Sequence, residues 1–171
     1  MDLTHLHLML NHLPVIGTPV VAALLLWGLL RGSRELLRTA AGAAVIVAAI
    51  SYPVFLTGEP AEDRVEDAAW YQERLVHEHE ERSEAALIAV LVTGLVAAVT
   101  LWQSRGGRDV PKATAGLTLA GLAVSAGLFG WAALAGGVIR HDEVRAGAVA
   151  ATPGDSAAQV GGTKRDRDKD D

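Results

Sequence analysis

The distribution of charge along the chain constrains the fold most strongly, because it leaves four long stretches without Asp, Glu, Lys or Arg. These stretches cover residues 3–30, 39–58, 85–104 and 113–139. A transmembrane helix needs about 20 mainly apolar residues to cross about 30 Å of hydrocarbon, and each stretch reaches that length. A helix of a soluble bundle would instead carry polar residues along one face. The four stretches therefore predict membrane spans.

The sequence thus predicts an all-α integral membrane protein, with a four-helix bundle in residues 1–145. The predicted spans cover about residues 7–30, 39–58, 85–104 and 113–139. The acidic segment at residues 59–84 carries ten acidic and three basic residues, a net charge of −7. We expect it to form an extra outer helix, either amphipathic on the membrane surface or extending the third span. Residues 146–171 lack the apolar content to fold alone and predict a tail that is disordered or bound to a partner.

The basic residues beside the spans predict the orientation, because cytoplasmic loops carry an excess of Lys and Arg. They lie in two short connections: Arg31, Arg34 and Arg38 in the first, and Arg105, Arg108 and Lys112 in the second. Both connections are therefore expected in the cytoplasm, with both termini and the acidic segment outside (N-out and C-out). In a bacterium this orientation describes a multi-pass protein of the inner (cytoplasmic) membrane.

All six histidines lie near the predicted outer ends of the spans. They are His5, His7 and His12 in the first span, His77 and His79 before the third, and His141 after the fourth. The outer ends of three helices can therefore bring imidazoles together on one side of the membrane. The chain has no Cys, so the ligands for a metal or cofactor are limited to His and carboxylates.

Imidazoles on different helices favour a b-type haem, whose iron takes two axial ligands in an apolar slot. The predicted haem ligands, for one or two haems, are His5, His12, His77 and His141. His5 and His12 share a helix face about 10.5 Å apart along the axis, so each would serve a different cofactor. Tyr52 is predicted to hydrogen-bond a propionate or a ligand histidine. His7 and His79 are interpreted as polar residues of the membrane interface.

Two other interpretations remain open. The chain can be a membrane protein that binds or transports a transition metal. His77 and Glu81 are one helical turn apart and, with His79, can form a zinc or copper site; His12 is a further ligand in this reading. The chain can also be a structural subunit without a cofactor, whose histidines are only interfacial. A basic patch is lacking and the net charge is −5, so the sequence does not indicate nucleic-acid binding.

The motif HLHLMLNHLPVIG at residues 5–17 precedes Thr57-Gly58-Glu59 and then His77-Glu78-His79-Glu80. This layout resembles a widespread bacterial family of four-helix membrane proteins without an assigned activity. Members begin with a His, a short apolar step and a second His followed by Pro, and continue with Thr-Gly before an acidic, His-containing segment. The resemblance covers residues 5–140. It implies a membrane protein whose His pattern is similar to that of b-type cytochromes with helix-borne ligands.

These expectations converge on electron transfer by a membrane-bound b-type haem protein. The absence of a recognisable catalytic motif favours a subunit or anchor of a larger redox complex over a stand-alone enzyme. The expected partners are membrane lipid and other protein subunits of that complex.

Overall fold

The computed structural model describes residues 3–141, and this part of the chain folds into helices and connecting turns. The helices are α1 (Leu3–Leu10), α2 (His12–Arg31), α3 (Arg34–Leu56), α4 (Gly58–Glu62), α5 (Glu73–Gln103) and α6 (Lys112–Arg140). Four segments are long and apolar enough to cross a membrane: Thr4–Arg31, which joins α1 and α2, together with α3, α5 and α6. For the described residues, the prediction of an all-helical fold with four helices long and apolar enough to cross a membrane is confirmed, while the predicted tail at residues 146–171 lies outside the described part.

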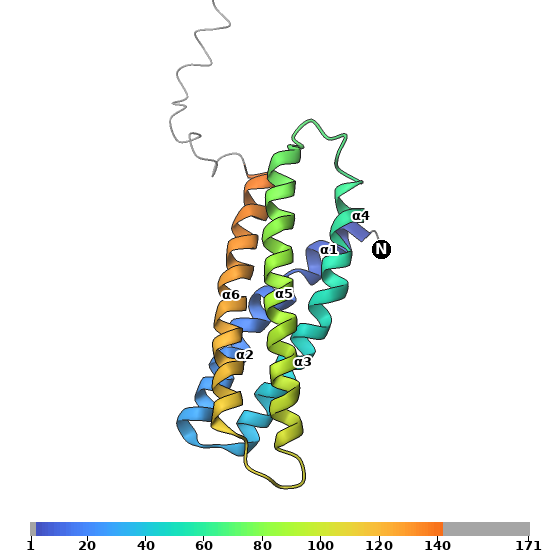
Figure 1. Cartoon of the computed structure of the whole chain (residues 1–171). Helices are drawn as coiled ribbons and strands as arrows, with labels where there is room; N and C mark the ends of the chain where they lie inside the picture. The colour runs from blue at the N-terminus through green and yellow to red at the C-terminus, as the bar shows by residue number, and fades with distance from the viewer. Residues whose placement is uncertain (1–2, 142–171) are drawn as a thin grey trace, which may run out of the picture.

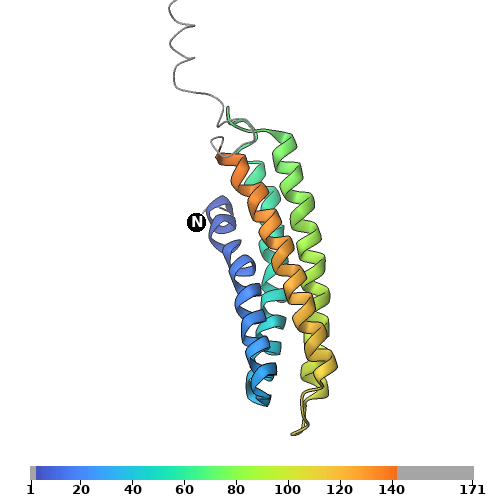
Figure 2. The same cartoon turned by 90° about the vertical axis from the view of Figure 1, so that its left-hand side faces the viewer.

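The spans alternate in direction along the bundle (Figure 1). The start of α1, α4, the start of α5 and the end of α6 lie at one end, which we call the histidine end. The connections at residues 32–33 and 104–111 lie at the opposite end, which we call the arginine end. Helix α5 packs most extensively against α6 and α3, and α2 packs against α3 and α6. The view in Figure 2 shows α1 and α2 forming one side of this bundle.

Local sequence explains the tight turn between α2 and α3. Gly32 ends α2 in the left-handed conformation at φ 60°, which costs glycine little. Ser33 then caps α3 by accepting a hydrogen bond from the Leu36 N–H at 3.4 Å. At the same end, the Arg38 guanidinium donates to the carbonyl oxygen of the buried Ser104, which closes α5.

The first span is broken at Asn11, between α1 and α2. Pro14 has no N–H to donate to the carbonyl of Leu10, so the regular helical ladder is interrupted one turn before the proline. The Asn11 N–H still donates to the His7 carbonyl at 2.9 Å, which keeps the two helices nearly in line. This break leaves α1 packed mainly against α4 and α2.

Many small residues pack in the interior beside a few larger ones such as Leu25 and Leu122, and large apolar residues cover the outside, as expected for helices that pack in lipid. Ala40, Ala86 and Ala115 have no exposed surface, whereas Leu30 and Leu134 are at least 70% exposed. Helices α3 and α5 approach closely where a β-carbon added at Gly94 would lie 2.4 Å from the Ala48 β-carbon. Helix packing in this bundle therefore depends on particular glycines.

The acidic segment is divided among three structures. Residues 58–62 form the short helix α4, residues 63–72 form turns with an extended entry into the next helix, and α5 begins at Glu73 rather than at residue 85. The Tyr71 hydroxyl donates to a Glu62 carboxylate oxygen at 2.5 Å, which ties the turns to α4. The Arg140 guanidinium lies 4.2 Å from the centre of the Trp70 ring, which ties them to the end of α6.

Candidate functional site at the histidine end

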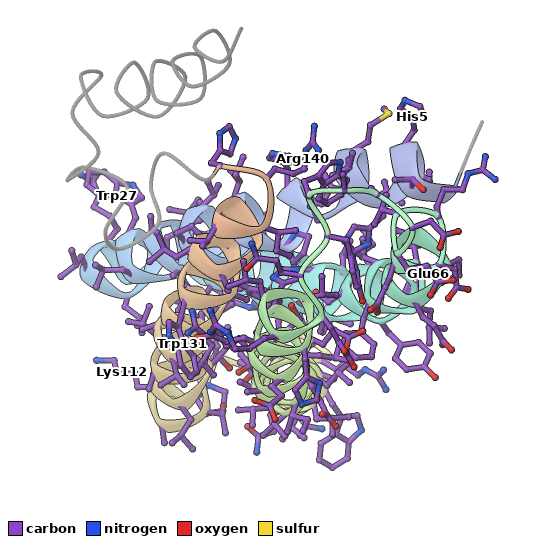
Figure 3. All side chains as sticks on the ribbon, turned by 90° about the horizontal axis from the view of Figure 1, so that it is seen from above. His5, Trp27, Glu66, Lys112, Trp131 and Arg140 are labelled. Atoms are coloured by element: carbon purple, nitrogen blue, oxygen red, sulfur yellow. The ribbon has the colours of Figure 1, made fainter. Side chains whose placement is uncertain are left out.

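An inward-facing row of residues at alternating spacings of three and four runs along the first span. Its members are Thr4, His7, Asn11, Pro14, Thr18, Val21, Leu25 and Gly28, all at least partly buried. This spacing keeps residues on one helical face. His7 lies on the face that packs into the bundle, whereas His5 and His12 lie off it and are exposed. In Figure 3 the His5 side chain points away from the other helices.

Helix α5 has a matching inward-facing row. Its members are His79, Ser83, Ala86, Val90, Thr93, Ala97 and Thr100, again at least partly buried. His77 lies off this row and is exposed. Each of the two helices therefore directs one imidazole, His7 or His79, toward the interior at the same end of the bundle.

The His79 ring is held by the backbone of α6. Its Nδ1 lies 2.9 Å from the carbonyl oxygen of Ala132. A carbonyl oxygen only accepts, so Nδ1 carries the ring hydrogen, and in the neutral imidazole Nε2 keeps a free lone pair. The ring can approach this carbonyl because Gly136 stands one turn further on: a β-carbon there would lie 3.0 Å from the His79 Cε1.

The His7 ring is held at the junction of α3 and α4. Its Nδ1 lies 2.9 Å from the Thr57 hydroxyl oxygen, and a β-carbon added at Gly58 would lie 3.7 Å from its Cε1. On the same inward row, the Thr4 hydroxyl oxygen and the Asn11 side-chain carbonyl oxygen are buried without a hydrogen-bond partner. His7 therefore has two unsatisfied polar groups close to it in sequence and on the same face.

Both inward imidazoles lie near the histidine end of their helices. They come from α1 and α5, which are not major packing partners; α1 packs mainly against α4 and α2. His7 and His79 thus place two nitrogen donors at one end of the bundle, from segments about 70 residues apart in the sequence. We call these two residues the inward histidine pair.

The predicted ligands of the first span are placed differently. His5 and His12 are exposed, and the His12 Nδ1 bonds the Leu8 carbonyl oxygen at 2.9 Å on its own span. Tyr52, the predicted hydrogen-bond donor, is 52% exposed on the outer face of α3. The structure does not bring these three side chains into the interior, and their assignment to a haem stays a prediction.

The other two predicted ligands also lie on the surface. The His77 Nε2 lies 3.3 Å from a Glu81 carboxylate oxygen on the same helix. His141 follows α6 and lines an open groove of about 520 Å³ with Ala133, Leu134, Gly137 and Val138. These lining residues all belong to the last turns of α6 and the residue after it, so the groove lies on the surface of one helix.

The alternative metal set of His77, His79 and Glu81 is not assembled. His77 and Glu81 contact each other, but His79 turns to the α6 backbone. Within residues 3–141, the structure holds no group of three or more His, Asp or Glu side chains placed to bind one metal ion. The donor arrangement at this end is therefore a pair of imidazoles rather than a carboxylate-rich cage.

From their positions in the sequence, His7 and His79 are predicted to lie at the membrane interface. The spacing of buried residues along each helix nevertheless identifies both as inward-facing. The buried spacing of Pro14, Thr18 and Val21, continued backward, reaches Asn11 and His7. The spacing of Ala86, Val90 and Thr93 likewise reaches His79. Extending each helical face to the end of its span separates inward from outward histidines.

In comparisons with known proteins, no protein-family model, no curated protein and no solved structure matches this chain.

Proposed function

We propose that the chain is a membrane-bound b-type haem protein that transfers electrons, and that His7 and His79 are the residues that would hold the haem iron. The observation that carries this proposal is the inward histidine pair: two imidazoles on separate helices, both on the inward-facing rows at one end of the bundle. Two imidazoles are enough to hold a low-spin haem iron, and no third protein donor is needed.

The residues around the pair fit such a group. The His79 Nδ1 donates to the Ala132 carbonyl, which leaves Nε2 free as a ligand atom; metal-bound histidines usually make such a second hydrogen bond. The buried Thr4 hydroxyl lacks a partner and can donate to an acceptor such as a propionate carboxylate. A haem supplies one-electron exchange between ferric and ferrous iron, and the protein tunes it through ligation and burial.

The same donor set disfavours zinc or copper. Structural zinc sites use four protein ligands and catalytic sites use three. Residues 3–141 provide no group of three candidate ligands. A two-imidazole arrangement therefore supports haem over a simple metal ion.

The proposal extends to location and partners. The chain would lie in the bacterial inner membrane with its histidine end outside, because the arginine end carries the basic connections expected in the cytoplasm. A haem near the outer surface would exchange electrons with another subunit of a membrane redox complex. The chain would then act as an electron-transfer subunit rather than as a stand-alone enzyme.

An absorbance titration of the purified full chain with haemin tests this function. We expect stoichiometric binding and, after reduction by dithionite, the spectrum of low-spin haem b. His7→Ala and His79→Ala should each abolish that spectrum, while the matched exposed variants His5→Ala, His12→Ala, His77→Ala and His141→Ala should retain it. Loss of the spectrum in the exposed variants alone would move the ligands to that set. Failure of the wild-type chain to bind haem would overturn the function.

A further inference from the structure

Thr57 joins α3 to α4 and makes two hydrogen bonds with one hydroxyl. Its oxygen lies 2.6 Å from the Val54 carbonyl oxygen and 2.9 Å from the His7 Nδ1. Two oxygens this close need a hydrogen between them, and a carbonyl cannot supply one. The single hydroxyl hydrogen is therefore given to Val54, and only lone pairs remain on the side facing His7.

This arrangement decides which nitrogen of His7 carries the hydrogen. A ring nitrogen facing a lone pair at 2.9 Å must itself donate, so Nδ1 is the protonated nitrogen. We propose that Thr57 is a positioning residue that fixes His7 in the Nδ1–H tautomer and leaves its Nε2 free to act as a ligand atom. The tautomer follows from the contacts alone, and its use by an iron centre rests on the proposed function.

In this proposal both inward histidines carry the ring hydrogen on Nδ1 and leave Nε2 free, although different groups hold the two rings. The Ala132 backbone carbonyl holds His79. The Thr57 hydroxyl holds His7, and the Val54 carbonyl is a second acceptor beside that ring. Both rings then offer Nε2. A backbone carbonyl cannot be removed by substitution, but the Thr57 hydroxyl can. The hydrogen bond of Thr57 to His7 can therefore be tested directly.

Thr57 is also well suited to a clean substitution. It precedes α4, yet its side chain makes no capping hydrogen bond to that helix. Thr57→Val keeps the branched shape and removes only the hydroxyl, while Thr57→Ser keeps the hydroxyl. Thr114→Val is a matched control, because it removes a hydroxyl that bonds Gln103 at the arginine end.

Nitrogen NMR of the full chain, labelled with ¹⁵N-histidine and held in lipid nanodiscs without haem, measures the tautomer. The His7 signals are assigned by their loss in His7→Gln. At a pH well above the ordinary imidazole pKa of about 6.5, we expect a protonated Nδ1 and an unprotonated Nε2 at His7. Thr57→Val should shift hydrogen to Nε2, whereas Thr57→Ser and Thr114→Val should keep the wild-type pattern.

Two results would overturn the proposal: an Nε2–H tautomer at His7 in the wild-type chain, or an unchanged tautomer in a folded Thr57→Val. If Thr57→Val does not fold, the wild-type tautomer and its retention in Thr57→Ser still decide the question. A parallel haemin titration separates this inference from the proposed function. Second hydrogen bonds of metal-bound histidines typically change metal affinity about 10–100-fold, so Thr57→Val should weaken binding by that factor. A confirmed tautomer without haem binding would reject the function and keep the role of Thr57.

Discussion

The imidazole of His79 lies directly against Gly136, so that a β-carbon at position 136 would stand 3.0 Å from Cε1 and 3.2 Å from Nδ1 of the ring. This contact places Nδ1 on the Ala132 carbonyl one turn earlier in α6. A glycine in the middle of a helix normally costs about 1 kcal/mol relative to alanine. At position 136 the absence of a side chain leaves the space that the His79 ring occupies.

Gly136→Ala should therefore displace His79 from the Ala132 carbonyl. We expect the Nδ1–H signal of His79 in ¹⁵N NMR to change and, under the proposed function, haem affinity to fall about 10–100-fold. Gly137→Ala is the matched control, because a β-carbon at Gly137 meets no atom within 4 Å. Equal behaviour of the two variants would contradict the contact between ring and glycine.

The contact of α3 with α5 gives a second pair of matched variants. In Gly94→Ala the new methyl would lie 2.4 Å from the Ala48 β-carbon, so the helices must separate. Overpacking of this kind costs about 1–3 kcal/mol, more than the roughly 1 kcal/mol that alanine gains as a helix former. We expect a lower thermal unfolding temperature in detergent.

Gly127→Ala controls for helix propensity, because nothing lies within 4 Å of its added β-carbon. This variant should be neutral or up to about 1 kcal/mol more stable. A Gly94→Ala protein as stable as Gly127→Ala would show that the α3 and α5 backbones do not approach as closely as described.

The spans could be predicted from the sequence because lipid imposes a simple rule on length and charge. The uncharged stretch at residues 113–139 corresponds to α6, which runs from Lys112 to Arg140. The uncharged stretch does not give the start of α5 at Glu73, because its first turns are acidic; extension of the third span is one of the two alternatives predicted for this segment. A charge pattern marks where hydrocarbon ends rather than where a helix begins.

The candidate site could be predicted only in part. The concentration of histidines at one end was evident from their positions beside the spans. Distinguishing His77 from His79 requires the direction of the inward-facing side of α5. The buried residues from Ala86 to Thr100 give that direction, and extending their spacing backward reaches His79. The contact of His7 with Thr57 joins residues 50 positions apart and depends on how α1 docks on α4, so no local pattern predicts it.

The hydrogen bond between Tyr71 and Glu62 predicts a pH dependence at the histidine end. The Glu62 carboxylate accepts from the hydroxyl and raises the pKa of Tyr71 to about 12. The neutral phenol is the bound form, so the stabilising contribution is complete below the ordinary tyrosine pKa of about 10. It is lost as the pH rises through the folded value of about 12.

Ultraviolet titration of tyrosinate measures this effect. We expect one transition near pH 12 that disappears in Tyr71→Phe and remains in Tyr52→Phe. Glu62→Gln keeps a hydrogen-bond acceptor but removes the negative charge, so it should move the transition toward about 10. A Tyr71 that titrates near 10 in the wild-type chain would contradict the hydrogen bond.

The orientation can be tested directly because the chain has no Cys to remove first. Glu66 lies in the turns of the histidine end (Figure 3), and Asp109 lies in the connection before α6; both are exposed. Replacing either acid with Cys leaves every Lys and Arg in place, and acidic residues contribute little to orientation. In intact cells, a membrane-impermeant maleimide should label Glu66→Cys, and should label Asp109→Cys only after the cells are opened. The reverse pattern would place the histidine end in the cytoplasm, and a redox partner would then have to be sought on that side.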